Sequence, residues 1–592
     1  MMSDIFKNLN KQQNEAVTYV DGPSIIIAGA GSGKTRVLVS KVFHLIKNCS
    51  VDPHSIIMIT FTNKAAGEMK ERIKMSLGFV GTFHSFCARV LRCNGDVIGL
   101  DNYFTIYDEN DQDALIKKII KEMDVERLSS HYFLNRISAA KNQLIHPVRF
   151  LELFSDHNAS LVSTVYKEYE KQLRKNKAVD FDDLIMRSID LFIKHPEILE
   201  KYQRKYTYIL VDEFQDTNYA QYTLTRLLSD LPAGRQESQR NITVVGDFSQ
   251  SIYSWRGADI KNLEKFQEDF SDTKVFSLEE NYRSTQKILD FAYEVISKNQ
   301  THPILHLFTS NKEGEDIDFF EAENEEYEAL YVADKIKELS RHEPYSSLAV
   351  LYRTNAQSRI IEESFLHYGI PYVLVGGTRF YERKEIKDVL SYLRLLINPT
   401  DEIAKDRVVK IGKKKWDSFK GMYKSIQEDI DKKTTSELME EIFQSTGYLQ
   451  LYNPDDEEDY DRLENIKELK SVAITHPKLI EFLEQVALVE SEYFEGERKK
   501  GNKDGVRLMT LHQAKGLEFS HVFIVGLEEG LLPHSRSIDN IYELEEERRL
   551  FYVGITRAKS KLYITYARRR FIFGRRANAA KSRFIDSSWE QF

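Results

Sequence analysis

A glycine-rich turn near the amino terminus constrains the fold of this chain more than any other feature. The turn connects an apolar run, Ser24–Ala28, to a helical pattern, Arg36–Ile46. Glycines at such a turn let backbone N–H groups point inward at phosphate oxygens, and the helix start adds partial positive charge. The sequence therefore predicts a phosphate-binding P-loop between a strand and a helix. Its eight residues are Ala28, Gly29, Ala30, Gly31, Ser32, Gly33, Lys34 and Thr35.

Two residues at the end of this loop carry the predicted chemistry. We expect Lys34 to reach the β- and γ-phosphates of a nucleotide and Thr35 to bind Mg²⁺. Ala28 stands where the strict pattern has glycine, which is a small deviation. The alternative, a glycine-rich turn without a ligand, is disfavoured by the strand and the helix on either side.

Polar residues follow two further apolar runs. Tyr208–Val211 ends in Asp212 and Glu213, which we expect to hold Mg²⁺ and to polarise the attacking water, respectively. Ile242–Val245 leads to Gln250, whose amide can sense a γ-phosphate. Taken alone, an acidic pair is typical of a solvated strand end, and a glutamine is typical of a loop. Beside a P-loop, both favour a nucleotide-hydrolysing site.

Short apolar runs separated by helical patterns recur along the chain. Such runs are typical of parallel strands that are covered by helices on both faces. One group precedes residue 285 and another follows residue 315, which predicts two α/β domains. Residues 90–204 and 386–502 are mostly helical in pattern and highly charged, so we expect helical insertions there. The clearest runs are Ser24–Ala28, Ser55–Phe61, Tyr208–Val211, Ile242–Val245, Ser347–Tyr352 and His521–Val525.

Composition limits the classes to which the chain can belong. Its 592 residues are too many for one hydrophobic core, and 42% hydrophobic with 30% charged residues is ordinary for a soluble protein. No apolar run approaches the ~18 residues that cross a bilayer, and the first residues lack the apolar core of a signal peptide. We therefore expect a cytoplasmic protein. Its three cysteines, Cys49, Cys87 and Cys93, fit neither a disulfide framework nor a zinc site.

Charge is unevenly distributed along the sequence. The net charge is −9, yet twelve Lys and Arg and no Asp or Glu occur from Arg548 to Arg583. A basic run of this kind is as typical of a solvated face as of a phosphate-binding surface. A different segment, Leu231–Arg240, contains Pro, Gly and polar residues and is predicted to be an exposed loop.

Ordered sequence blocks point to a family. They resemble the motifs of superfamily 1 DNA helicases of the UvrD/PcrA/Rep type, and they cover nearly the whole chain in the family's order. One such block can arise by chance, but this many in the correct order cannot. Besides the P-loop, the blocks are Leu9–Gln13, Thr60–Ala66, Gly81–Phe86, Asp212–Asn218, Gln250–Ala258, Asn281–Ser284, Leu351–Arg359, Glu382–Asp388, Thr510–Phe519 and Glu545–Lys559.

The resemblance implies an enzyme that binds ATP and Mg²⁺. It assigns Gln13 to the adenine and Glu518 to the ribose, with Arg36 and Tyr282 stacking on the base. It also implies two arginine fingers, Arg283 and Arg557, which we expect to reach the γ-phosphate from the far side of the cleft. A loose phosphoryl transition state carries more charge than one lysine can neutralise, so two guanidinium groups are chemically reasonable.

The resemblance also implies movement on single-stranded DNA with 3′→5′ polarity. Single strands are held by base stacking on aromatic side chains and by phosphate contacts. Phe61 is equally typical of a core residue. The residues expected to contact DNA are Phe61, Thr62, Asn63, His84, Tyr253, Trp255, Arg256, Arg359 and His512.

The predicted architecture is two RecA-like motor domains, each carrying a mainly helical insertion. The predicted partners are single-stranded DNA and junctions of single- and double-stranded DNA, with repair or replication proteins and no membrane. The first motor domain is assigned to residues 1–89 and 205–284 with its insertion at 90–204, and the second to 285–385 and 503–592 with a reduced insertion at 386–502.

Some departures from the family pattern leave alternatives open. The insertion after Asn398-Pro399 is shorter than is usual in the family, and Phe248-Ser249 precede Gln250 where the family has acidic residues or Pro-Asp. One alternative is therefore a translocase that displaces proteins from DNA but unwinds little. Others are a nuclease-linked relative, an RNA-directed enzyme, and a DNA-binding scaffold with a degenerate ATPase.

Overall fold

The computed structural model describes residues 9–125, 128–230, 241–454, 456–498, 504–572 and 575–585. The chain divides into two compact units. Unit 1 comprises the chain through Arg283 together with Gln300–Ser310, and unit 2 comprises Ser284–Asn299 and the chain from Asn311 onward. The sequence analysis assigned residues 300–310 to the second motor domain, whereas the structure groups them with unit 1. The predicted loop Leu231–Arg240 lies outside the described residues.

Unit 1 is built on a six-stranded, fully parallel sheet in the order β3-β2-β6-β7-β1-β8. The four interior strands coincide with predicted apolar runs. The two edge strands, β3 and β8, were not predicted, because only part of each is buried. The strands are β1 (Ser24–Ala28), β2 (Ile56–Thr60), β3 (Phe79–Thr82), β6 (Tyr208–Val211), β7 (Asn241–Gly246) and β8 (Lys274–Leu278).

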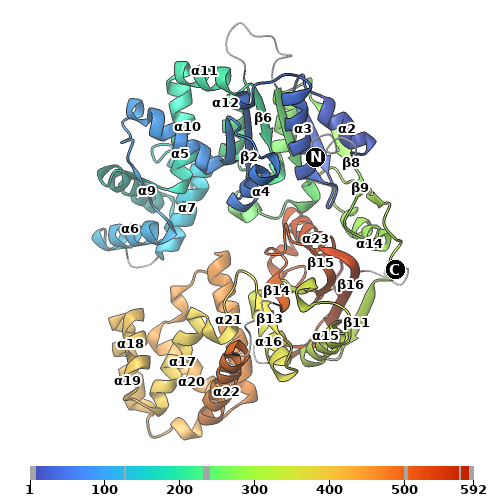
Figure 1. Ribbon diagram of the computed structural model, residues 1–592. Coiled ribbons are helices and arrows are strands. Elements are labelled where there is room, and N and C mark those ends of the chain that lie inside the picture. Colours follow the sequence, from blue (N-terminus) through green and yellow to red (C-terminus); the bar gives the residue numbers. More distant parts are fainter. Residues whose placement is uncertain are drawn as a thin grey trace. The chain divides into compact units, whose positions relative to one another are not determined.

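Both faces of this sheet are covered. Alternate residues of a strand point to opposite faces, so Ile25 and Ile27 enter one hydrophobic core while Ile26 and Ala28 enter another. The second core is completed by α2 (Lys11–Thr18), α3 (Lys34–Lys47) and α4 (Asn63–Ile73), which are blue in Figure 1. The first is completed by α5 (Phe83–Asn94), α10 (Phe181–Lys194), α12 (Tyr219–Ser229) and α13 (Asn262–Asp269).

The helical insertion of unit 1 has a core of its own, centred on Phe133, Tyr166 and Tyr169. Two short strands, β4 (Thr105–Ile106) and β5 (Ala178–Val179), pair beside it. Figure 1 shows these helices gathered beside the sheet of unit 1. They are α6 (Glu109–Glu122), α7 (Ser130–Asn142), α8 (Phe150–Leu153), α9 (Ala159–Lys175) and α11 (Pro196–Lys205), together with α10.

Unit 2 also contains a six-stranded parallel sheet, in the order β11-β16-β15-β12-β14-β13. Only β12 and β15 coincide with predicted runs, because polar residues interrupt β11, β14 and β16, and β13 has only three residues. The prediction of two parallel α/β sheets is confirmed. The strands are β11 (Asp318–Ala322), β12 (Leu348–Tyr352), β13 (Tyr372–Leu374), β14 (Val506–Thr510), β15 (Phe519–Ile524) and β16 (Ala558–Ala567).

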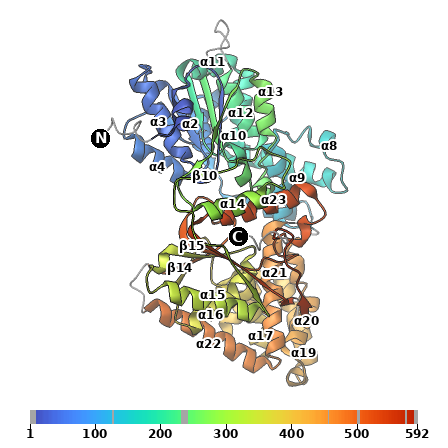
Figure 2. The same ribbon diagram turned by 90° about the vertical axis from the view of Figure 1, so that its right-hand side faces the viewer.

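Helices cover the sheet of unit 2 and form a separate insertion. Helices α15 (Glu325–Leu339) and α16 (Ser358–His367) pack on one face, while α14 (Gln286–Ile296) and α23 (Ile541–Ile555) contact β15 or β16 (Figure 2). A hairpin, β17 (Arg569–Ile572) and β18 (Arg575–Asn578), follows β16. The insertion contains α17 (Lys384–Ile397), α18 (Glu402–Ile411), α19 (Lys413–Ile426), α20 (Thr435–Thr446), α21 (Glu457–Thr475) and α22 (Leu479–Arg498) around one core.

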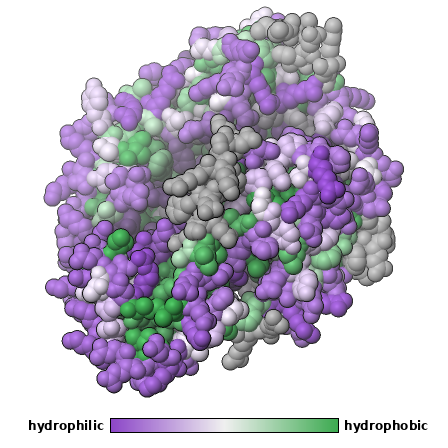
Figure 3. All heavy atoms as spheres, turned by 60° about the horizontal axis from the view of Figure 1, so that its bottom comes forward, coloured by the Kyte–Doolittle hydropathy of each residue, from purple (hydrophilic) through white to green (hydrophobic). Residues whose placement is uncertain are grey.

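The surface is mostly hydrophilic on the face drawn in Figure 3, with hydrophobic side chains in smaller groups. Scattered exposed apolar residues of this kind are normal for folded proteins. Within the described residues, no helix has the length and the apolarity that crossing a membrane requires.

Candidate nucleotide-binding site

The P-loop of unit 1 leaves the end of β1 and enters α3. Gly31 and Gly33 have positive φ angles of 67° and 84°, which glycine adopts without strain. A Cβ atom at Gly29 would lie 2.3 Å from Leu307, and one at Gly31 would lie 2.7 Å from Asn281. No side chain in the described part of the chain caps α3 at Gly33. Glycine has no side chain that could occupy the space in front of the helix start, which leaves room for a phosphate there.

Two acidic residues at the end of β6 stand beside the P-loop lysine. The Nζ atom of Lys34 lies 3.5 Å from Oε2 of Glu213. Asp212 is buried, and its Oδ1 atom accepts no hydrogen bond from the described residues. Burial and, second, the Glu213 charge raise the pKa of Asp212 to about 7, although the Lys34 charge opposes them. A buried carboxylate oxygen without a donor fits a hard cation such as Mg²⁺.

A hydrogen-bonded chain links these acids to the predicted γ-phosphate sensor. The amide of Gln215 donates to Oε2 of Glu213 at 2.6 Å and accepts from the backbone N–H of Asp247 at 3.0 Å. Gln250 in turn donates to Oδ2 of Asp247 at 2.6 Å. Sequence reasoning placed Gln215 and Asp247 within or beside the matched motifs but assigned neither of them a role at the site. The available signal was their position directly after β6 and β7, the two strands whose ends form this site.

The segment Asn281–Arg283 is bound to the P-loop. Asn281 is fully buried; its amide donates to the carbonyl of Ala30 at 2.6 Å and accepts from the backbone N–H of Arg283 at 2.7 Å. The N–H of Tyr282 donates to the carbonyl of Gly31 at 3.0 Å. Arg283 therefore belongs to the unit that carries the P-loop. The expectation that it comes from the far side of the cleft is wrong, because the chain passes into unit 2 only after this residue.

The predicted adenine contacts lie at the other end of the loop. Gln13 is buried; it donates to the carbonyl of Ser32 at 2.9 Å and accepts from the N–H of Asn10 at 3.2 Å. Tyr282 is 43% exposed, so a face of its ring is available for stacking. Burial raises the pKa of Tyr282, and the nearby Arg36 charge lowers it by a smaller amount. The role of Gln13 as adenine reader stays a prediction, since its amide here holds the P-loop.

The loop after Gln250 presents an aromatic and basic surface. Trp255 is 44% exposed, and the guanidinium carbon of Arg256 lies 4.4 Å from its ring centre. Tyr253 is more buried, and burial followed by the Asp216 charge raises its pKa to about 12. An exposed indole beside a guanidinium suits stacking on bases of a single strand.

The other predicted DNA contacts of unit 1 occupy helix starts. Thr62 caps α4 by accepting from the N–H of Ala65 at 3.1 Å, and Asn63 begins that helix. Phe61 packs edge-to-face on Phe83 at 6.2 Å and joins the hydrophobic core, which supports its core interpretation. His84 packs on Phe181 at 5.8 Å, and burial lowers its pKa.

Unit 2 supplies the remaining predicted nucleotide contacts. Arg557 is 1% exposed, and its guanidinium donates to the carbonyls of Val553 at 2.9 Å and Leu517 at 3.2 Å. Glu518 pairs with Lys559 at 2.7 Å. These bonds fix the orientation of Arg557 within its own unit. His512 is half-buried in the turn after β14.

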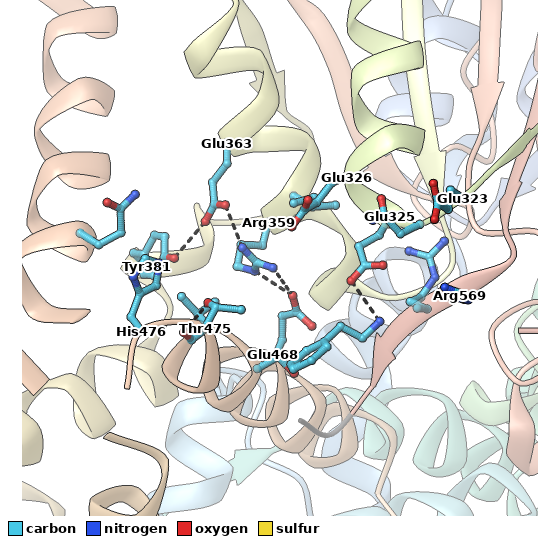
Figure 4. A pocket seen from close by; sticks show the side chains of 17 residues that line it. Glu323, Glu325, Glu326, Arg359, Glu363, Tyr381, Glu468, Thr475, His476 and Arg569 are labelled. Carbon is cyan, nitrogen blue, oxygen red and sulfur yellow. Dashed lines mark hydrogen bonds and ion pairs between the residues drawn. The ribbon is translucent and has the colours of Figure 1, made fainter. Parts of the chain in front are cut away.

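Arg359 has carboxylate partners inside unit 2. Its guanidinium lies 2.8 Å from Glu363 and 2.7 Å from Glu468, and Tyr381 donates to Glu363 at 3.0 Å (Figure 4). The side chain is 12% exposed. Arg359 thus ties α16 to α21 of the insertion, and its predicted contact with DNA gains no support from this arrangement.

The basic run from Arg548 to Arg583 is partly neutralised within unit 2. Sequence reasoning left a solvated face and a phosphate-binding surface open, and five of the twelve cations have carboxylate partners, some of them on the exposed surface. Arg570 is buried between Glu528 at 2.5 Å and Glu328 at 2.7 Å. The other pairs are Lys559–Glu518, Lys561–Glu315, Arg568–Glu321 and Arg583–Glu529.

Comparisons with known proteins identify the family of the chain. The model of the UvrD/REP helicase N-terminal domain matches residues 9–271, and the model of the UvrD-like helicase C-terminal domain matches residues 276–419 and 410–569. The chain belongs to the UvrD-like helicase family. The resemblance drawn from the ordered motifs is thereby confirmed.

Three relatives of this UvrD-like helicase carry the name ATP-dependent DNA helicase PcrA. The protein of Bacillus subtilis is 44% identical, and the match covers 98% of this chain and 86% of that protein. The protein of Staphylococcus epidermidis is 42% identical over 99% of this chain and 87% of its own length. The protein of Staphylococcus aureus is 41% identical over 99% and 86%, respectively.

Proposed function

We propose that this UvrD-like helicase is an ATP-driven 3′→5′ translocase on single-stranded DNA that separates DNA strands. The observation that carries the proposal is the buried Oδ1 atom of Asp212, which accepts no hydrogen bond from the described residues and lies near the charges of Lys34 and Glu213 at a P-loop. The names of relatives that are 41–44% identical support ATP and DNA as substrates. Action in repair or replication, with partners of those pathways and a cytoplasmic location, is part of the proposal.

The residues at the edge of the unit 1 sheet would divide the work of hydrolysis. The loop amides and Lys34 bind the phosphates, and Thr35 with Asp212 holds Mg²⁺, which neutralises charge on the phosphate oxygens when bound. Glu213 orients the attacking water and accepts its proton. Gln250 senses the γ-phosphate and passes its presence through Asp247 and Gln215 to Glu213.

Two arginines would complete charge compensation from different units. Arg283 is held on the P-loop by its own backbone and by Asn281. Arg557 belongs to unit 2, so its action on a nucleotide bound to unit 1 requires the units to approach each other. We infer that ATP favours the closed arrangement and that hydrolysis releases it, because the γ-phosphate would give Arg557 an additional anionic contact in the closed state.

Bound DNA would be gripped alternately by the two units as they close and open. In unit 1 the stacking and phosphate contacts come from Tyr253, Trp255 and Arg256. Further contacts in this unit come from Thr62, Asn63 and His84 of the earlier motifs. In unit 2 the contact comes from His512. The 3′→5′ direction rests on the family resemblance.

ATPase activity measured with and without single-stranded DNA tests this function, with a Lys34→Ala variant as control. We expect stimulation by DNA in the natural chain and loss of turnover in the variant. A strand-displacement assay run beside a translocation assay separates unwinding from translocation alone. Equal ATPase rates with and without DNA would contradict the proposal.

A further inference from the structure

The last residue of helix α7 reaches the motifs that carry the motor chemistry of unit 1. The side-chain carbonyl of Asn142 accepts a hydrogen bond from the amide of Asn218 at 2.7 Å. Asn218 ends the block that begins at Asp212, and it caps α12. Gly257 follows Trp255 and Arg256, and a Cβ atom there would lie 3.9 Å from both asparagines. The helical insertion, the nucleotide motif and the DNA-contact loop therefore come together at Asn142, Asn218 and Gly257.

The orientation of Asn142 is fixed from its own side. Its amide nitrogen donates to Oγ of Ser138 at 3.3 Å, one turn earlier in α7, which turns the carbonyl toward Asn218. The preceding residue, Lys141, is fully buried and pairs with Asp180 at 2.7 Å and Asp183 at 3.0 Å. Breaking a buried pair of this kind is costly, so the end of α7 moves together with α10 and the insertion.

The partner side of the contact is equally well connected. The carbonyl of Thr217, the residue before Asn218, accepts from the N–H of Asp259 at 3.0 Å and from the amide of Asn262 at 2.8 Å. The backbone that follows the catalytic acids is thus tied to the segment that follows Trp255. A shift of the insertion that pulls on Asn218 acts on both.

We propose that Asn142 is a positioning residue through which the helical insertion sets how strongly DNA at Trp255 and Arg256 stimulates ATP hydrolysis at Asp212 and Glu213. The proposal deepens the proposed function and rests on it. Asn142 touches neither substrate. It acts by holding Asn218, and with it the backbone between the two motifs, in one arrangement relative to the insertion.

The central test compares Asn142→Ala with the natural chain in ATPase assays with and without single-stranded DNA. Coupling energies between sites correspond to about 5-fold or larger changes, so we expect the stimulation ratio to fall about 5-fold. The basal rate should stay unchanged, and the thermal unfolding midpoint should fall only slightly, because one half-buried hydrogen bond is lost. An unchanged stimulation ratio, or a basal rate that falls by the same factor, would overturn the proposal.

A second variant keeps the test decisive if Asn142→Ala folds poorly. Asn218→Ser retains an N-cap oxygen for α12 but is too short to reach Asn142, so it should lower the stimulation ratio by a similar factor. Combining both substitutions should add no further loss, whereas an additive loss would argue against a shared contact. The matched control is Asn324→Ser, which makes the same change at the N-cap of α15 in unit 2 and should leave the ratio unaltered.

The failure of this inference is distinguishable from failure of the proposed function. If DNA does not stimulate the natural chain, the proposed function is contradicted before any variant is compared. If DNA stimulates the natural chain and Asn142→Ala equally, only the role of Asn142 is overturned.

Discussion

The two parallel sheets of this chain use opposite edges. In unit 1 the predicted catalytic residues Lys34, Asp212 and Gln250 follow the carboxyl ends of β1, β6 and β7. In unit 2 the predicted nucleotide residues Glu518 and Arg557 precede β15 and β16, at their amino ends.

The carboxyl edge of unit 2 holds charges too, but they are compensated. Arg353 follows β12 and pairs with Glu547 at 2.8 Å, and Arg570 lies between Glu528 and Glu328. At the corresponding edge of unit 1, Asp212 keeps an oxygen without a donor among the described residues. The comparison indicates that the fold alone makes no nucleotide site; the predicted site of unit 1 differs by a phosphate-binding loop and a buried carboxylate oxygen without a hydrogen-bond donor among the described residues.

The largest effect should come from the amino edge of unit 2. Arg557→Ala should lower DNA-stimulated turnover about 10³-fold, because arginine fingers carry that share of phosphoryl-transfer catalysis. Arg557→Lys should not rescue the rate, since lysine lacks the planar fork of donors. Steady-state ATPase measurements check both variants, with thermal unfolding as the control for folding. A loss below tenfold would remove Arg557 from the site.

Removing a carboxylate from the charge-compensated carboxyl edge of unit 2 should affect stability rather than catalysis. Glu528→Gln leaves the buried Arg570 short of a carboxylate, so the free energy of unfolding of unit 2 should fall by about 3 kcal/mol. Denaturant unfolding, followed by far-UV circular dichroism, measures the change. Below the unfolding transition, ATPase activity should match that of the natural chain, and a selective loss of activity would show that this edge serves catalysis.

The carboxyl edge of unit 1 should respond in the opposite way, with a loss of catalysis rather than of stability. Glu213→Gln should reduce turnover about 10²-fold, as expected when a general base is removed. Stability should be retained, because Glu213 is partly exposed and its partner Gln215 can still form a hydrogen bond. Fluorescent nucleotide titration should show ATP binding close to that of the natural chain. Loss of binding without a change in turnover would reverse the assigned role.

The smallest effect concerns the DNA-contact loop beside that edge. Trp255→Ala should weaken binding of single-stranded DNA about tenfold, because stacking contributes roughly 1–3 kcal/mol per base. DNA stimulation of ATPase activity should be lost as well. Fluorescence anisotropy with a labelled oligonucleotide measures the affinity. Unchanged affinity together with unchanged stimulation would refute coupling through this loop.

The sequence predicted those parts of the fold that are encoded by local patterns. Interior strands such as β1 and β7 are apolar on both faces, so their runs stood out. Edge strands such as β8 expose part of their length, and β16 lies within the basic run, so neither gave a continuous apolar signal. Local composition cannot report an environment that distant strands create.

The site shows the same division. Lys34, Asp212 and Gln250 were predictable because each follows a strand in a recognisable motif. The contact between Asn281 and Ala30 joins residues 251 positions apart, and Arg359 meets Glu468 at a separation of 109. No short window of sequence contains both partners of either contact. The hydrogen bond from Asn281 to the P-loop and the structural role of Arg359 were therefore visible only in the fold.

ATP hydrolysis by the natural chain and by Lys34→Ala, each with and without single-stranded DNA, tests the central claim most directly. The account predicts a DNA-stimulated rate for the natural chain and a rate for the variant that is lower by about 10²-fold or more under both conditions. A variant that hydrolyses ATP at the natural rate, or a natural chain that ignores DNA, would contradict it.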